Sequence, residues 1–263
     1  MIRDITIGQY YPAKSVIHKL DPRTKLFGTL VFIISVFLFH SIAGYAVATV
    51  FLAGMILIST VPVKFIFKGL KAIFMILLIT MVFNILLTPG EAIVTLGIFK
   101  ITKEGISMAV RMAIRLIYLV IGSSLMTLTT TPNQLTDGLE KSLRPLNKIH
   151  VPVHEIAMMM SIALRFIPIL LEETDKIMKA QIARGADFEN GNLIQKVKNM
   201  VPLFISAFRR ANDLAMAMEA RCYHGGDNRT QMKPLKYKKR DHIAYLILFA
   251  YLAVAIGFRM AGL

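Results

Sequence analysis

Two stretches of this sequence end in the same way: residues 181–185 read Gln-Ile-Ala-Arg-Gly, and residues 218–222 read Met-Glu-Ala-Arg-Cys. Each closes a long run in which apolar residues recur at spacings of three and four, with one proline partway along, Pro168 or Pro202. That spacing is typical of an amphipathic helix. The block from residue 151 to residue 226 is therefore predicted to be two long helices that end in Ala-Arg-small triplets, as a degenerate internal repeat would.

The arginine of each triplet lies at the end of an apolar stripe. Arg184 follows Ile177 by seven residues, and Arg221 follows Leu214 by seven, so each arginine shares a face with these apolar side chains. An arginine that serves only solubility more often lies on the opposite face. Two interpretations stay open: each arginine caps its own helix, or each presents a guanidinium fork to a partner.

Composition restricts the class of protein. The chain has 263 residues, of which 55% are apolar, with a mean hydropathy of +0.58 and a formal charge of +15. A nucleic-acid-binding protein would explain the charge but not the hydropathy, whereas a membrane protein with basic residues on one side explains both. The lone Cys222 excludes an intramolecular disulfide and a multi-cysteine metal cluster.

Apolar runs predict an all-α integral membrane protein with about five spans. The excess of Lys and Arg between the runs places the N-terminus in the cytoplasm and the C-terminus outside. A β-rich stretch at 94–102 predicts a small hairpin. The run at 156–171 is apolar enough to touch lipid, but Arg165 and Pro168 argue against an ordinary span. The expected spans are residues 26–39, 45–61, 72–88, 105–130 and 243–258.

These segments imply three parts. Residues 1–130 form an N-terminal transmembrane bundle of four spans, residues 131–240 a cytoplasmic helical domain, and residues 241–263 a C-terminal transmembrane helix. In the fourth span, Arg111 and Arg115 lie one turn apart. They are expected to reach the interface or a neighbouring helix, or to anchor the packing of the helices.

Other chemistry finds little support. His150, His154 and Glu155 lack a metal-ligand order, so no metal is expected, and no catalytic constellation or cofactor motif is found. The basic run at 233–240 precedes an apolar span, which favours a topology determinant or a contact with anionic lipid over nucleic acid. The 16 methionines are either adaptable core filler or a surface that accepts several partners.

The N-terminal stretches Gly8-Gln9-Tyr10-Tyr11-Pro12 and Ser15–Lys25, which ends Asp-Pro-Arg-Thr-Lys, together with the two triplets, resemble the transmembrane (T) component of energy-coupling factor transporters. The resemblance covers essentially the whole chain. The second triplet departs from the family's pattern, because Cys222 stands where Gly, Ser or Ala is more usual.

The resemblance implies a helical membrane bundle with long cytoplasmic coupling helices that cross in an X, in the plasma membrane of a prokaryote. It implies a non-catalytic scaffold with two ABC-type ATPase subunits and a membrane-embedded substrate-binding S component for a vitamin or metal ion. The alternative is a self-sufficient secondary transporter or channel. By match, the ATPase-docking residues are Ala183, Arg184, Gly185, Ala220, Arg221 and Cys222, and S-component contacts are expected at Met158, Met159, Met160, Phe166, Phe204 and Phe208.

Overall fold

The chain folds as two compact units: residues 8–138 with 235–263, which we name the bundle, and residues 139–234, which we name the α6–α7 unit. The structure is a computed structural model that describes residues 10–39, 41–96, 99–186, 193–225, 232 and 234–260. Gly8 and Gln9 of the N-terminal motif therefore lie outside the described residues. The predicted division at residues 130 and 240 stays a prediction.

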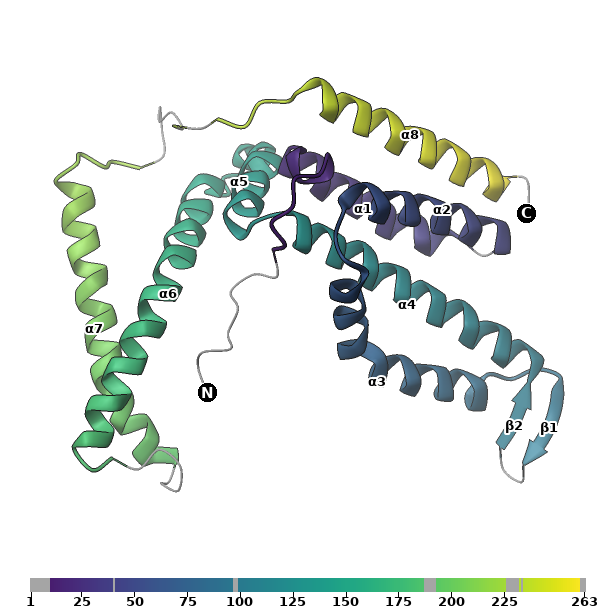
Figure 1. Cartoon of the computed structure of the whole chain (residues 1–263), viewed down its shortest axis with the longest axis horizontal. Coiled ribbons are helices and arrows are strands. Elements are labelled where there is room, and N and C mark those ends of the chain that lie inside the picture. Colours follow the sequence, from purple (N-terminus) through teal and green to yellow (C-terminus); the bar gives the residue numbers. More distant parts are fainter. Residues whose placement is uncertain are drawn as a thin grey trace. The chain divides into compact units, whose positions relative to one another are not determined.

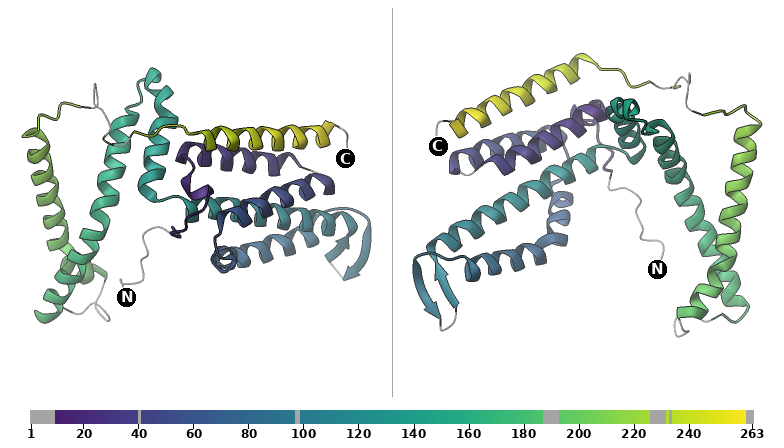
Figure 2. Two further views of the ribbon diagram at one scale, coloured as in Figure 1. Left: turned by 45° about the horizontal axis from the view of Figure 1, so that its top comes forward. Right: turned by 180° about the vertical axis from the view of Figure 1, so that it is seen from behind.

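Helices of the bundle pack side by side, and α3 and α4 are joined at one end by a two-stranded hairpin (Figures 1 and 2). The antiparallel pairing of β1 with β2 confirms the hairpin expected near residues 94–102. The elements are η1 (Ile17–Lys19), α1 (Pro22–Leu38), α2 (Ile42–Ser59), α3 (Val63–Leu87), β1 (Ala92–Leu96), β2 (Phe99–Thr102), α4 (Lys103–Thr129), α5 (Pro132–Leu143, across the boundary between the units) and α8 (Lys239–Met260).

Each helix of the bundle divides its apolar residues between a core and an outer surface. On α1, Phe32 and Val36 are buried against α2 and α8. The opposite face of α1 exposes large apolar side chains at spacings of three and four: Phe27, Leu30, Ile34 and Phe37. Such a surface has no favourable contact with water and suits the hydrocarbon of a membrane.

Among the residues that the structure describes, three helices are long and apolar enough to cross a membrane: α4, α8 and α6 (Val153–Ala183). Helix α3 is bent by 56° between its two halves. If both halves together form one span, α3 is a fourth candidate. The segment at 62–71, expected as a cytoplasmic loop, is mostly the first half of this helix, because nothing in its sequence breaks helical hydrogen bonding after Pro62. The count of about five spans stays a prediction.

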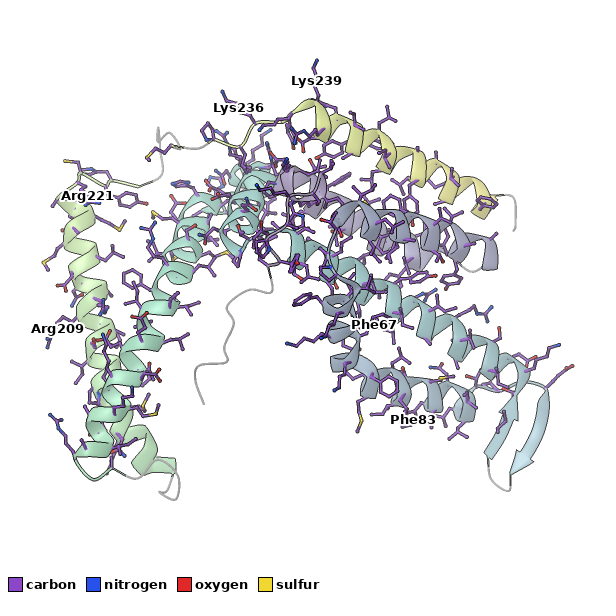
Figure 3. The ribbon with its side chains drawn as sticks, in the orientation of Figure 1. Phe67, Phe83, Arg209, Arg221, Lys236 and Lys239 are labelled. Atoms are coloured by element: carbon purple, nitrogen blue, oxygen red, sulfur yellow. The ribbon has the colours of Figure 1, made fainter. Side chains whose placement is uncertain are left out.

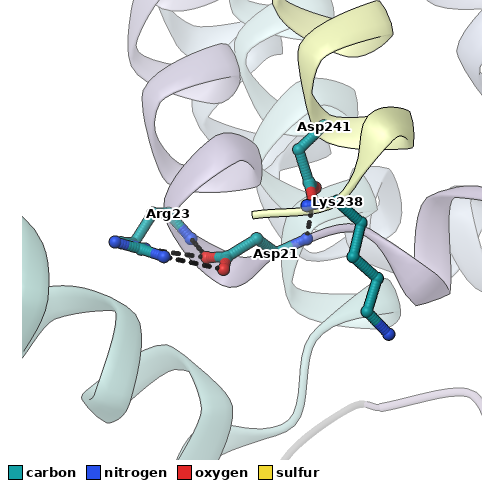
Figure 4. Close-up of polar contacts among 4 residues, drawn as sticks. All are labelled: Asp21, Arg23, Lys238 and Asp241. Carbon is teal, nitrogen blue, oxygen red and sulfur yellow. Dashed lines mark hydrogen bonds and ion pairs between the residues drawn. The ribbon is translucent and has the colours of Figure 1, made fainter. Parts of the chain in front are cut away.

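A polar cluster, which we name the α1–α8 clasp, ties the first helix to the last (Figure 4). The Asp241 carboxylate accepts the backbone N–H of Asp21 and that of Lys238, each at 2.8 Å. The Asp21 carboxylate in turn accepts two guanidinium bonds from Arg23 at 3.0 Å. The Arg23 guanidinium also stacks 3.9 Å from the ring centre of Tyr237. The Asp-Pro-Arg segment of the N-terminal motif thus has a structural role.

Next to the clasp, His18 and Lys25 close the chain onto the end of α4. His18 donates from Nε2 to the Tyr11 carbonyl at 2.9 Å, so its Nδ1 accepts the Ser15 hydroxyl at 2.7 Å. The Lys25 ammonium donates to the Thr129 carbonyl at 2.8 Å. Burial lowers the pKa of His18, and the Lys25 charge lowers it further, against the opposing effect of the bond to Tyr11.

The two arginines of α4 differ in their surroundings. Arg115 is half-buried and donates from Nη2 to the Phe39 carbonyl at 3.4 Å, where α1 ends. Arg111 is exposed. Arg115 therefore satisfies an orphan carbonyl of a neighbouring helix, which favours the packing-anchor interpretation for this residue.

The α6–α7 unit consists of the end of α5, η2 (Arg144–Ile149), α6 and α7 (Leu193–Glu219). Helix α6 is anchored to α5 where His154 Nδ1 lies 2.8 Å from a Glu140 carboxylate oxygen. Helices α6 and α7 lie against each other over part of their length and then diverge (Figure 1). The two long helices predicted from the sequence are confirmed.

Candidate functional site

Helices α6 and α7 stay continuous through their internal prolines, Pro168 and Pro202. They touch through a polar contact. The Glu173 carboxylate of α6 accepts the Ser206 hydroxyl and also Arg210 Nε, the latter at 2.9 Å. Arg210 Nη2 lies 2.8 Å from the same carboxylate. This partly exposed ion pair fixes where the two helices cross.

Helix α6 ends at Ala183 in a closed turn. The backbone N–H groups of Arg184 and Ala186 both donate to the Gln181 carbonyl at 3.0 Å, and that of Gly185 donates to Ile182 at 2.9 Å. Gly185 has a φ of +89°, in the left-handed region. These bonds satisfy carbonyls that would otherwise be left open at the end of the helix.

Helix α7 ends in the same turn. The backbone N–H groups of Arg221 and Tyr223 both donate to the Met218 carbonyl at 3.1 Å, and that of Cys222 donates to Glu219 at 2.8 Å. Cys222 has a φ of +56° and so takes the left-handed position that Gly185 takes on α6. The two triplets are therefore alike in backbone hydrogen bonding as well as in sequence.

This turn explains the small third residue of each triplet. The left-handed position brings Cβ close to the following carbonyl oxygen, and glycine avoids that contact. Cys222 accepts some strain there because its side chain is slim and unbranched. The departure of the second triplet from the family's pattern thus leaves the local backbone unchanged.

Both arginines lie at the ends of the helices that carry them. Arg184 and Arg221 are exposed, and neither side chain bonds to, or pairs with, any residue that the structure describes. Figure 3 shows Arg221 at the free end of α7. A capping arginine would bond to the last carbonyls of its helix, but the turns described above already supply partners there. The arrangement favours a guanidinium held ready for a partner. Ala183 and Ala220 are also exposed.

An apolar surface runs along the same two helices. Met159, Met160, Phe204 and Phe208 are exposed, with Phe208 72% accessible, whereas Met158 and Phe166 are half-buried. The structure thus places four of the six residues expected for an S-component contact on the surface. Large exposed apolar groups of this kind mark an interaction surface or a lipid contact.

This surface includes apolar residues that were not predicted from the sequence. Val201 and Ile205 are exposed and share the face of Phe204 and Phe208, and their spacing of three and four could have identified them. The contact from Glu173 to Ser206 and Arg210 gave no such signal. Ser206 and Arg210 follow Glu173 by 33 and 37 residues in the chain, and only the packing of α6 on α7 brings them together.

The histidines near the start of α6 do not assemble a metal site. His154 contacts Glu140, and the residues that the structure describes hold no group of three His, Cys, Asp or Glu side chains placed to bind a metal ion. His150 has a φ of +62° and forms the turn that ends η2. His150 thus serves to end η2 through its backbone conformation.

The chain is similar in sequence to known proteins of one family. Residues 13–232 match the CbiQ family, described as cobalt transport protein. The energy-coupling factor transporter transmembrane protein EcfT of Clostridium kluyveri is 57% identical over 97% of each chain. EcfT of Acidaminococcus fermentans is 49% identical over 100% of this chain and 99% of that protein, and EcfT of Bacillus subtilis is 47% identical over 96% and 98%. The chain therefore belongs to the family of transmembrane components of energy-coupling factor transporters.

Proposed function

We propose that this chain is the non-catalytic scaffold that couples ATP hydrolysis by two associated ABC-type ATPases to uptake through a separate S component. The observation that carries the proposal is the pair of matched helix ends. Two triplets with the same backbone turn present two exposed arginines, which suits two ATPase subunits of similar shape. Each fork can bind a carboxylate or backbone carbonyls in a groove through charge-assisted bonds.

Mechanically, α6 and α7 serve as levers. Helices are stiff over their length, so a movement of the ATPases at Arg184 and Arg221 is carried to the apolar faces of both helices. The pair between Glu173 and Arg210 holds the crossing point, about which the levers turn. The S component then reorients in the membrane and releases its substrate inward.

The S component is proposed to lie against the exposed apolar surface of α6 and α7. Met159 and Met160 supply flexible thioethers, and Phe204 and Phe208 supply rigid rings. Such a surface suits an apolar membrane partner and tolerates partners of different shape. The proposed substrate class is a vitamin or metal ion, and its choice belongs to the S component.

The experiment reverses both charges, Arg184→Glu with Arg221→Glu, in the chain expressed with its natural partner subunits. We expect the double variant to insert in the membrane, to lose co-purification of the ATPases and to lose uptake. Arg209→Glu is the matched control, because Arg209 is an exposed arginine on the side of α7, away from its end (Figure 3). It should keep both properties.

A second variant separates the two proposed surfaces. Phe208→Asp should lose the S component and keep the ATPases. If the double arginine variant still assembles and transports, the docking proposal is wrong. If the chain alone, reconstituted in liposomes, supports uptake, the competing hypothesis of a self-sufficient transporter replaces it.

A further inference from the structure

A pocket of about 180 Å³ lies inside the bundle, between α1, α2, α4 and α8. Its walls are apolar, with Phe32, Leu52, Met55, Leu125 and Leu248 among the residues that form them. An engineered cavity of about 150 Å³ in another protein holds a benzene molecule and stays dry. The pocket is therefore large enough for a stretch of hydrocarbon and offers water few hydrogen bonds.

The pocket opens at the surface of the bundle. Ile58 of α2 and Ile243 and Ile247 of α8 line it, and each is at least half exposed. Such apolar side chains at an opening make entry from a membrane favourable for hydrocarbon and unfavourable for water. Gly28 of α1 also lines the pocket, and a Cβ added there would meet no heavy atom within 4 Å.

The threonines of the pocket wall present little polarity to it. Thr29 and Thr129 donate their hydroxyls to the carbonyls of their own helices, those of Lys25 and Leu125. Thr24 is the exception: its hydroxyl is buried and has no hydrogen-bond partner in the described part of the chain. One buried polar atom therefore lacks a partner in the wall of this otherwise apolar space.

Positive charge surrounds one end of the pocket. Arg240, at the start of α8, lines the pocket, is exposed, and forms no ion pair with any residue that the structure describes. Lys25 also lines it, with its ammonium held by backbone carbonyls. The nearby carboxylates already have partners: Asp21 binds Arg23, and Asp241 accepts two backbone N–H groups.

We propose that this pocket binds one acyl chain of an anionic phospholipid, whose phosphate lies at Arg240. The apolar walls take the hydrocarbon, and the cations at the rim take the phosphate. The starts of α1 and α8 and the ends of α2 and α4 all meet here. By the distribution of basic residues this is the cytoplasmic side, where anionic headgroups attract Lys and Arg. The lipid would act as a filler that stiffens the bundle.

The test measures lipid binding to the full-length chain in detergent by native mass spectrometry. The probes are dioleoyl phosphatidylglycerol and dioleoyl phosphatidylcholine. We expect one tightly held phosphatidylglycerol per chain. Gly28→Leu places a side chain in the pocket and should weaken binding about tenfold or more. Gly54→Leu is the matched control, because Gly54 has the same open space around its Cβ but does not line the pocket.

A second pair of variants tests the headgroup. Arg240→Gln should reduce the preference for phosphatidylglycerol over phosphatidylcholine by roughly three- to tenfold. Lys239→Gln should change it little, since Lys239 is the neighbouring cation, does not line the pocket and points away from the bundle (Figure 3). Equal losses from both variants would mean a diffuse basic surface and would overturn the phosphate site.

Photolabelling of the unsubstituted chain decides the matter if a glycine variant fails to fold. A phosphatidylglycerol with a photoreactive group in its acyl chain is added to membranes that contain the chain with its partner subunits. Labels on Met55, Met126 or Leu248 support the proposal. Labels confined to the outer faces of the helices overturn it, as does unchanged binding by Gly28→Leu.

Discussion

Cys222 illustrates how a single residue can depart from a pattern without changing its geometry. It follows Arg221 in a left-handed conformation with a φ of +56°, at the position where Gly185 follows Arg184. The backbone bonds around both residues correspond one to one. What the position requires is therefore a residue that tolerates a positive φ, and glycine tolerates it best.

The first prediction concerns this position. Cys222→Gly should stabilise the end of α7 by about 1 kcal/mol, because it removes the contact between Cβ and the following carbonyl. Cys222→Val should destabilise it, since a β-branched residue fits a positive φ poorly. Hydrogen exchange of the amides of residues 222 and 223 measures both effects: slower exchange in the glycine variant and faster exchange in the valine variant. Equal exchange in all three chains would contradict the prediction.

The second prediction concerns His18, whose pKa is lowered mainly by burial. The folded state therefore binds a proton less readily than the unfolded state, for which the ordinary value is 6.5. His18 contributes its full stability above pH 6.5, and part of it is lost as the pH falls through the lowered pKa. The thermal midpoint should drop more between pH 7.5 and 5.5 in the unsubstituted chain than in His18→Gln. Parallel pH profiles would show that protonation of His18 does not matter.

Among elements, α8 depends on contacts far away in the sequence. It begins 218 positions after Asp21, yet the Asp241 carboxylate near its start accepts the Asp21 backbone N–H. Farther along, Tyr251 of α8 shares a 2.6 Å hydrogen bond with Ser35 of α1. A buried carboxylate with two backbone donors stabilises only while both bonds form, because an unpaired buried donor is costly. The clasp thus fixes how α8 meets α1.

The third prediction removes the acceptor of the clasp. Asp241→Ala leaves the N–H groups of Asp21 and Lys238 without their partner, so the bundle should lose about 1–3 kcal/mol of stability. Thermal unfolding in detergent, followed by helicity, measures the loss. Asp213→Ala is the control, because Asp213 is exposed on α7 and its removal should leave the midpoint unchanged. A midpoint equally unchanged in Asp241→Ala would mean that water replaces the carboxylate.

At the scale of the whole molecule, the chain divides into two compact units, the bundle and the α6–α7 unit. The bundle gathers α1 to α4 with α8, although the 96 residues of the α6–α7 unit lie between α4 and α8 in the sequence. The return of the chain to the bundle places α8 in its core cluster, through Tyr251 and Ala255. In the sequence, the α6–α7 unit is therefore an insertion between two segments of the bundle.

The fourth prediction concerns orientation in the membrane. Cys222, the one cysteine of the sequence, is exposed and should face the cytoplasm. In intact cells it should react with a membrane-permeant maleimide and not with an impermeant one. In a Cys222→Gly chain that also carries Gly262→Cys, the new cysteine should react with the impermeant reagent. Reaction of both cysteines from the same side would contradict the odd number of spans expected from the sequence.

The helical membrane class, the hairpin between α3 and α4, and the two long helices with matched ends could all be predicted from the sequence. Hydropathy, periodicity and turn residues are local properties of the sequence, so they can be recognised before the tertiary structure is known. The resemblance of the N-terminal motif and the triplets to a transporter family also came from sequence, and the relatives confirm it. The positions of Arg184 and Arg221 at the ends of apolar stripes follow from residue spacing alone.

Other features of the protein follow from the packing of distant helices and could not be predicted from the sequence. The packing of the helices joins Asp21 to Asp241, sets Glu173 against Ser206 and Arg210, and leaves a pocket between four helices that opens at the surface. Each of these depends on which faces of distant helices meet, and no local spacing records that choice. The triplet turns combine both kinds of information. The Ala-Arg-small pattern can be recognised in the sequence. The left-handed conformation that Gly185 and Cys222 share, which explains the small residue, is shown only by the backbone geometry.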